Sequence, residues 1–177
     1  MRTIRFVLLM VFAMALTASA QGTKVTGKAH CAKANPEYMI EVGDKPGHVL
    51  GARKAACTWT TPMEIAGSKT TTGEDVATME MSGSTVRDTG YHTATMDNGD
   101  KFTVHFQGTS KMNKDNTGSF EGKWTIVSGT GKLKGIKGGG PYKGLAAADG
   151  SGDVNVEGDY TIAPPPPPPA KKAPVKK

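Results

Sequence analysis

Residues 120–144 read FEGKWTIVSGTGKLKGIKGGGPYKG, and this stretch decides how the chain is expected to fold. It begins with an alternating run in which Trp124 and Ile126 share one face, and it holds eight glycines between Gly122 and Gly144. Glycine packs no side chain and loses much backbone entropy on folding, so this density needs a structural reason. In β proteins glycine marks bulges, tight bends at barrel corners and close approaches of two backbones. We therefore expect two strands joined by a glycine-rich bend.

Other segments repeat the alternating pattern. In residues 153–162, Val154, Val156 and Tyr160 share one face while Asp153 and Glu157 share the other, as in an antiparallel sheet with one buried face. Further extended runs lie at 37–42, 48–51, 54–60, 74–82, 85–96 and 101–107. No stretch after the first twenty residues has the apolar spacing of a helix. The pattern predicts an all-β barrel or sandwich of about eight strands.

Four segments carry a family resemblance: GDKPGH (43–48), CTWT (57–60), YHTATMDNGDKFTVHFQG (91–108) and GTGK (129–132). Across roughly residues 35–162 the chain resembles the allene oxide cyclase and dirigent barrel superfamily, and within it uncharacterised exported bacterial members. The resemblance implies a closed antiparallel barrel of about eight strands, which leaves no strand edge exposed. It also implies a pocket that acts by its shape, on lipid epoxides or on phenolic radicals. No functional residue of the superfamily is matched position by position.

The first twenty residues have the form of a secretory signal peptide. Arg2 and Arg5 precede an apolar run over residues 6–16, and the sequence Ala-Ser-Ala at 18–20 offers a cleavage site before Gln21. The apolar run is shorter than the ~18–20 residues that a spanning helix needs, so a membrane anchor is the weaker interpretation. We expect export to the periplasm or out of the cell, with no membrane span and with residues 21–163 forming one β-barrel domain.

The formal net charge of +6 does not indicate a nucleic-acid partner. Arg2 and Arg5 lie in the signal peptide and four lysines follow residue 170. Residues 21–163 contain 16 acidic and 16 basic side chains, so their formal net charge is zero. A nucleic-acid binder carries a basic footprint on its folded domain, so this class of function is excluded.

Cys31 and Cys57 are the two cysteines of the chain. In an oxidising compartment two cysteines pair by default, and we expect a disulfide between them. On the loop-entropy model, closing this separation of 26 residues stabilises the fold by about 3.5 kcal/mol. The alternative is two buried free thiols. No CxxC spacing occurs, and we expect neither a metal site nor a cofactor.

Residues 164–177 differ in chemistry from the rest of the chain. Six consecutive prolines at 164–169 favour a polyproline II helix of roughly 19 Å. Lys171, Lys172, Lys176 and Lys177 follow. The segment has too little apolar content to fold. It is either a solubilising tail or a contact for an anionic envelope polymer or a proline-binding partner.

An Asn-Gly dipeptide at residues 98–99 predicts a β-hairpin with a two-residue type I′ turn. That turn would place His92 directly opposite His105, with Cβ atoms about 4.5–5.5 Å apart. Such a pair could share a metal or repel when both rings are charged, and the alternative is a solvated pair on the outer wall. A shift by one residue would put His92 beside Val104 instead. Because no third ligand can be named, the pair does not predict a metal site.

A barrel cavity, if present, would be lined by inward-facing aromatic residues with a few polar groups at its mouth. The candidates are Tyr38, Trp59, Phe102, Phe106, Trp124 and Tyr160, with His48 and Tyr91 as polar groups. The alternative is that the same residues are the packed core of a small barrel, whose interior side chains can fill completely.

The sequence does not fit established catalytic motifs. The glycine-rich stretch lacks the G-x-x-x-x-G-K-[ST] pattern of a phosphate loop, and no G-x-S-x-G elbow occurs. The leading interpretation is therefore an exported monomeric β-barrel without catalytic activity that binds a small apolar or aromatic ligand. One alternative is a cyclase- or isomerase-like enzyme with an apolar cavity. Another is an envelope-associated interaction protein that uses its Pro/Lys tail.

Overall fold

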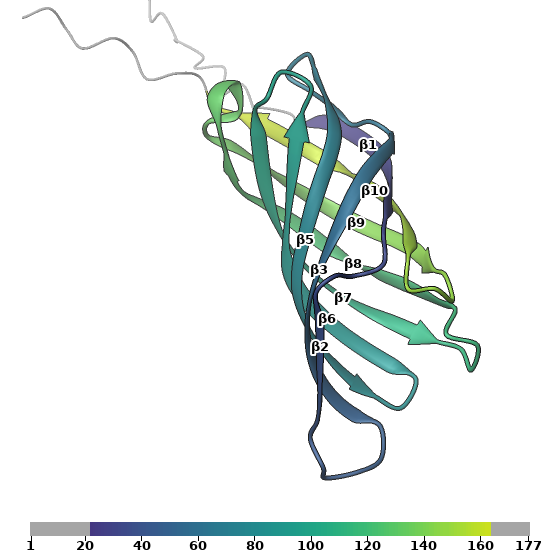
Figure 1. The fold of residues 1–177 in the computed structure, drawn as a ribbon. Coiled ribbons are helices and arrows are strands. Elements are labelled where there is room, and N and C mark those ends of the chain that lie inside the picture. The colour runs from purple at the N-terminus through teal and green to yellow at the C-terminus, as the bar shows by residue number, and fades with distance from the viewer. Residues whose placement is uncertain (1–21, 164–177) are drawn as a thin grey trace, which may run out of the picture.

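The computed structural model describes residues 22–163, and this part of the chain is all-β (Figure 1). The predicted signal peptide and the Pro/Lys tail lie outside the described residues. Within residues 22–163 the elements are β1 Thr23–Cys31, β2 Glu37–Glu41, β3 His48–Thr61, β4 Glu64–Ile65, β5 Ser68–Ser82, β6 Thr85–Met96, β7 Lys101–Met112, β8 Gly118–Gly129, the 3-10 helix η1 Gly131–Leu133, β9 Ile136–Ala146 and β10 Gly152–Ile162. No helix among them is long and apolar enough to cross a membrane.

Eight strands close into an antiparallel barrel. Hydrogen bonds link β1, β10, β9, β8, β7, β6 and β5 in that order, and β3 pairs with both β1 and β5 to complete the ring. The prediction of a closed antiparallel barrel of about eight strands is confirmed. The two remaining strands lie beside the ring, with β2 paired to β3 and β4 paired to β5.

The shortest seam of the ring is the one between β1 and β3. β1 pairs only with residues 57–61 of β3, while residues 49–53 of β3 pair with β2. Cys31 and Cys57 lie opposite each other at the end of this seam and form the predicted disulfide. The second edge of β2 pairs with no strand among residues 22–163.

Apolar side chains fill one half of the barrel. At the end that carries η1 and the β6–β7 turn, the largest fully buried apolar side chains are Phe102, Ile65, Met96 and Leu133. We call this the filled end. β1 begins and β10 finishes at the same end, so the first and last described residues lie close together there (Figure 1). Towards the opposite end the strands spread apart (Figure 1).

The glycine-rich stretch forms β8, η1 and β9, in agreement with the predicted strand, bend and strand. Gly131 and Gly135 have φ angles of 51° and 77°, which L side chains rarely adopt, so the bend requires glycine there. The bend returns Leu133 to the core with 1% exposure. Trp124 points inward as predicted, and its ring lies over Gly158, where any side chain would overlap it.

The β6–β7 turn differs from the predicted type I′ turn. Thr95 pairs with Lys101, and the Met96 N–H donates to the Asp100 carbonyl at 2.8 Å, which leaves a loop of three residues. Only Gly99 in this loop has a positive φ, at 84°. A type I turn followed by one left-handed residue gives this geometry. The pairing along the whole hairpin is therefore shifted by one residue from the prediction.

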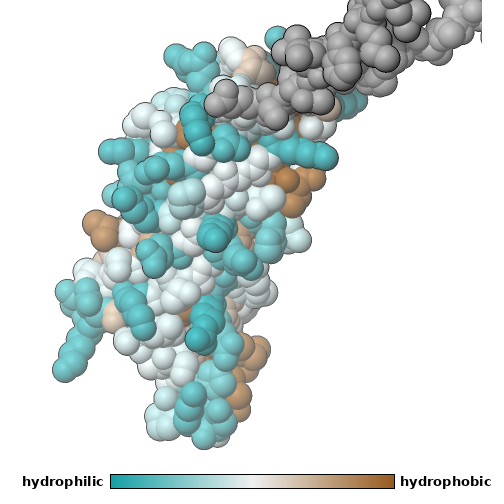
Figure 2. Space-filling view, turned by 180° about the vertical axis from the view of Figure 1, so that it is seen from behind, coloured by the Kyte–Doolittle hydropathy of each residue, from teal (hydrophilic) through white to brown (hydrophobic). Residues whose placement is uncertain are grey.

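The outer wall is largely hydrophilic when seen from behind the view of Figure 1, with apolar side chains in small separate clusters (Figure 2). Exposed large apolar residues occur on β2 and the start of β3, at Tyr38, Met39, Ile40 and Leu50. The segment predicted as the first clear strand, residues 37–42, thus lies beside the barrel. The residues before it form the barrel strand β1.

Candidate ligand-binding cavity

A cavity of about 1120 Å³, open to solvent, lies in the half of the barrel away from the filled end. Seven strands contribute to its wall, namely β3 and β5 to β10. The inward-facing positions are occupied by Gly51, Met79, Asp88, Gly108, Gly122 and Tyr142. Three of these six residues are glycines, which put no side chain into the interior. The cavity exists because these glycines leave the interior of this half open, whereas inward-facing positions in the filled half carry Phe, Trp and Ile side chains.

Arg53 forms an ion pair with Asp88, which lines the cavity. The Arg53 Nη2 donates to Asp88 Oδ2 at 3.1 Å, and the Asp88 side chain is only 10% exposed. The pair crosses β5, where Ala77, the partner of Arg53 in the sheet, is small enough to let the long side chain pass. Burial raises the pKa of Asp88 above its ordinary value, and the guanidinium opposes that shift. The Arg53 Nε is buried and has no partner among the described residues.

Tyr142 supplies the aromatic surface of the cavity. Its ring lies over Gly108 and Gly122, at both of which an added Cβ would overlap the ring or its hydroxyl. Phe106 meets it edge-on, with ring centroids 6.2 Å apart. Burial raises the pKa of Tyr142 far above its ordinary value, and the charges of Asp88 and Asp75 add to that shift. The hydroxyl stays protonated and makes no hydrogen bond within residues 22–163, so it remains free to donate one.

A second polar pair lies deeper in the barrel, between Asp75 and His92. The His92 Nδ1 and Asp75 Oδ1 are 2.6 Å apart, and the two side chains are 14% and 22% exposed. Trp59 meets the imidazole edge-on, with centroids 5.9 Å apart. His92 Nε2 is buried against Gly73 and has no partner among the described residues. The pair therefore holds the ring in one orientation within an otherwise apolar surrounding.

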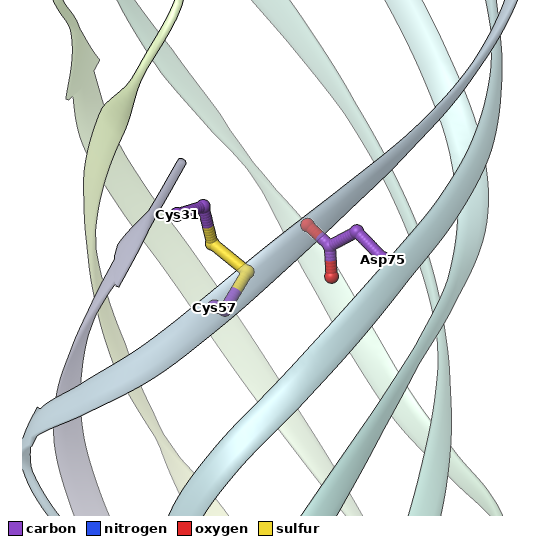
Figure 3. Close-up of side chains that lie close together, drawn as sticks. All are labelled: Cys31, Cys57 and Asp75. Carbon is purple, nitrogen blue, oxygen red and sulfur yellow. A yellow bond between two sulfur atoms is a disulfide. The ribbon is translucent and has the colours of Figure 1, made fainter. Parts of the chain in front are cut away.

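Asp75 also lies beside the disulfide (Figure 3). One carboxylate oxygen and the sulfur atoms of Cys31 and Cys57 are all within 4.8 Å of one another. Metal ions bind cysteine as the thiolate, and both sulfur atoms are used in the disulfide. In its oxidised form this group is therefore a covalent link next to a carboxylate, without the donor set of a metal site.

None of the eight residues predicted for the pocket lines this cavity. Trp59, Phe102, Phe106 and Trp124 belong to the packed core, and Tyr160 packs against it. The alternative interpretation of these residues, a packed core, thus describes the filled half of the barrel. The Tyr160 hydroxyl accepts a hydrogen bond from the Ala66 N–H at 3.1 Å.

The other three predicted residues lie on the outside or at the end of the wall. Tyr38 and Tyr91 are 66% and 53% exposed on the outer face. Tyr91 faces outward because the strand pairing is shifted by one residue. His48 is held between two carboxylates, with Nδ1 2.6 Å from Asp44 Oδ1 and Nε2 3.0 Å from Glu80 Oε1. Its side chain belongs to a salt-bridged cluster at the start of β3 and does not line the cavity.

The predicted cross-strand pair of His92 and His105 is wrong. His92 pairs with Val104 and faces the interior, while His105 pairs with Tyr91 and faces outward. His105 Nε2 lies 3.0 Å from the Thr89 hydroxyl. The three-residue loop causes the change, because a shift by one residue moves every side chain of a strand to the other face.

The sequence analysis missed Arg53, Asp75, Asp88 and Tyr142. A signal for one of them is present in the alternation of β6, where Asp88 shares its face with Gly90, His92, Ala94 and Met96. A charged residue in the apolar phase of a strand indicates either a buried ion pair or a site. Arg53 and Asp75 show the same signal on β3 and β5.

Comparisons with known proteins leave the family open. No family model matches the chain, and no curated protein matches it. Among solved structures, that of a pterocarpan synthase dirigent protein is similar with a TM-score of 0.44 and 13% identity, over 85% of this chain and 97% of that chain. We draw no conclusion about fold or function from a likeness of this size. The barrel is established by its strand pairing.

Proposed function

We propose that the barrel binds a small, largely apolar ligand in its open cavity. The observation that carries the proposal is the volume of about 1120 Å³, just above the range of about 300–1,000 Å³ that is typical of ligand pockets. A barrel of this strand number has an interior that side chains can fill or that can hold one ligand. Here glycines at three of the inward positions leave the space open.

The polar groups of the cavity define what the ligand must carry. The Tyr142 hydroxyl is a free donor, and the Asp88 carboxyl, which is paired with Arg53, also lines the cavity. The raised pKa values of Asp88 and Tyr142 both reflect a site that disfavours added negative charge. A neutral aromatic or alicyclic molecule with one hydrogen-bond acceptor facing Tyr142 fits these groups best.

Titration with the neutral fluorescent probe N-phenyl-1-naphthylamine tests the binding function. We expect saturable binding of one probe per chain. Met79→Trp places a large side chain in the cavity and should weaken binding at least about tenfold, which is about 1.4 kcal/mol, because the indole occupies space that the probe needs. Thr72→Trp, on the outward face of the same strand, is the matched control and should leave the affinity unchanged. Absence of saturation, or equal affinity of both variants, would contradict the proposal.

A second candidate function is acid–base catalysis of the cyclase or isomerase kind. The specific observation behind it is Asp88, whose pKa is raised by burial and whose carboxyl faces the same cavity as Tyr142. A carboxyl with a raised pKa can act as a general acid nearer to neutral pH. If neutral lipid epoxides are converted, Asp88→Asn should abolish product formation, followed by chromatography, while probe binding persists. Conversion at the wild-type rate by this variant would remove Asp88 from the mechanism.

We also propose that the protein works after export. Support comes from the signal-peptide pattern of residues 1–20 and from the Cys31–Cys57 disulfide, since disulfides persist in oxidising compartments. The lysines of the tail would then meet anionic envelope polymers. Cell fractionation of the wild type and of a chain without residues 164–177 tests both points. Recovery of the wild type in the cytoplasm would contradict export, and identical envelope association of the two chains would contradict the polymer contact.

A further inference from the structure

A second hollow lies on the outer wall, separate from the cavity inside the barrel. Its volume is about 630 Å³, and it spans β2, β3, β5, β6 and β7, which lie side by side in this order (Figure 1). Small outward-facing residues, Ala52, Thr78 and Thr89, form its floor. Tyr38 stands at one side and Tyr91 at the other. We call this hollow the outer groove.

The outer groove is rich in aromatic surface that the fold does not use. Tyr38, Val76 and Tyr91 are 66%, 51% and 53% exposed. Tyr91 and His105 contact each other edge-on, with ring centroids 5.2 Å apart. Within residues 22–163 the hydroxyls of Tyr38 and Tyr91 make no hydrogen bond. Exposed aromatic rings with free donors, arranged along an apolar groove, are the features by which proteins bind polyproline II helices.

The chain itself carries a ligand of this kind. Residues 164–169 are six prolines, which as a polyproline II helix extend roughly 19 Å. The outer groove crosses five neighbouring strands, and four spacings of about 4.8 Å also give about 19 Å. We propose that the outer groove binds the six-proline segment, residues 164–169, of a second copy of this chain.

The segment reaches the groove of another copy more readily than its own. Ala163 lies next to Gly135 at the filled end, beyond the last residues of β10. In the ring of eight strands β6 is four strands away from β10 in either direction, so the groove is on the opposite wall. The prolines begin immediately after Ala163, and a polyproline II helix is too stiff to turn around the barrel within six residues.

Contacts between the tail of one copy and the groove of the next are heterologous, and they make assemblies that grow with concentration. This differs from the monomer expected from the sequence. The test uses two variants of the full chain: Tyr91→Ala, which damages the groove, and a tail variant in which residues 164–169 become Gly-Ser repeats. Val127→Ala is the control, because Val127 is equally exposed, at 53%, but lies on β8 outside the groove.

Light scattering after size exclusion measures the mass of each protein across a range of concentrations. We expect the wild type and Val127→Ala to increase in mass with concentration, and each of the two variants alone to stay monomeric. Mixing Tyr91→Ala with the tail variant should restore one intact tail and one intact groove and give a 1:1 complex. The synthetic peptide APPPPPPAKKAPVKK should disperse the wild-type assembly. A monomeric wild type at millimolar concentration, association that survives in either variant, or no 1:1 complex on mixing would each overturn the proposal.

Discussion

Single residues decide which part of this barrel is packed and which is open. Gly108 and Gly122 leave room for the Tyr142 ring, and Ala77 lets Arg53 reach Asp88. The sequence analysis placed Trp124 and the alternating residues of β10 correctly, because their period of two is unbroken. It missed Asp88, a single charged residue on the apolar face of a strand. The partner of such a residue can be identified only when the order of the strands is known, because Arg53 lies on β3, on the far side of β5.

At the scale of single residues, the His48 cluster makes the stability of the fold depend on pH. Hydrogen bonds to Glu80 and Asp44 raise the pKa of His48 above its ordinary 6.5, and the bond to His48 lowers the pKa of Asp44 below 3.8. The stabilisation by protonated His48 is complete below the unfolded pKa and is lost as the pH rises through the folded pKa. The stabilisation by ionised Asp44 is present above its unfolded pKa and is lost as the pH falls through its folded pKa.

The cluster should therefore stabilise the fold most between about pH 4 and 6.5. We expect the difference in melting temperature between the wild type and His48→Gln to be largest in this window and to shrink as the pH rises above it. Thermal denaturation monitored by circular dichroism at a series of pH values measures it. His105→Gln is the control, since His105 contacts a threonine hydroxyl rather than a carboxylate. A difference independent of pH would show that His48 acts through packing alone.

At the scale of elements, turn geometry determines which side chains of each strand face the interior and which face the outer wall. The Asn-Gly signal correctly located the β6–β7 hairpin, but a two-residue and a three-residue loop both accept this dipeptide. The choice moved Tyr91 and His105 to the outer wall and His92 to the interior. The glycine-rich bend was easier to predict, because two left-handed positions within five residues leave few alternatives. The cavity itself depends on the register of seven strands, which no single turn reveals.

The disulfide should matter most at the short β1–β3 seam. Replacing both Cys31 and Cys57 by serine should lower the free energy of unfolding by about 3–4 kcal/mol, because the unfolded chain regains the entropy of a 26-residue loop. Hydrogen exchange should show lost amide protection in β1 and in residues 57–61 before the other strands. Urea denaturation gives the stability, and mass spectrometry gives the exchange. Uniform loss of protection around the ring would show that the seam is not a separate weak point.

At the scale of the molecule, the barrel has a filled end that provides stability and an open end that can provide function. Met96 and Met79 offer a comparison with one residue type. Met96 is 2% exposed in the core, whereas Met79 lines the cavity. Met96→Ala should cost about 2–5 kcal/mol, and Met79→Ala less than about 1 kcal/mol, because only the first leaves a new hole in a packed region. Urea denaturation of both variants measures this. Equal losses would mean that the two halves are packed alike.

The first and last described residues lie together at the filled end, and this has a practical consequence. A tag, a carrier domain or a solid support joined directly at Gly22 or at Ala163 would lie at the filled end, and the open half of the barrel would point away from it. Arrays of protein immobilised at either of these two residues would therefore present the cavity to a library of compounds.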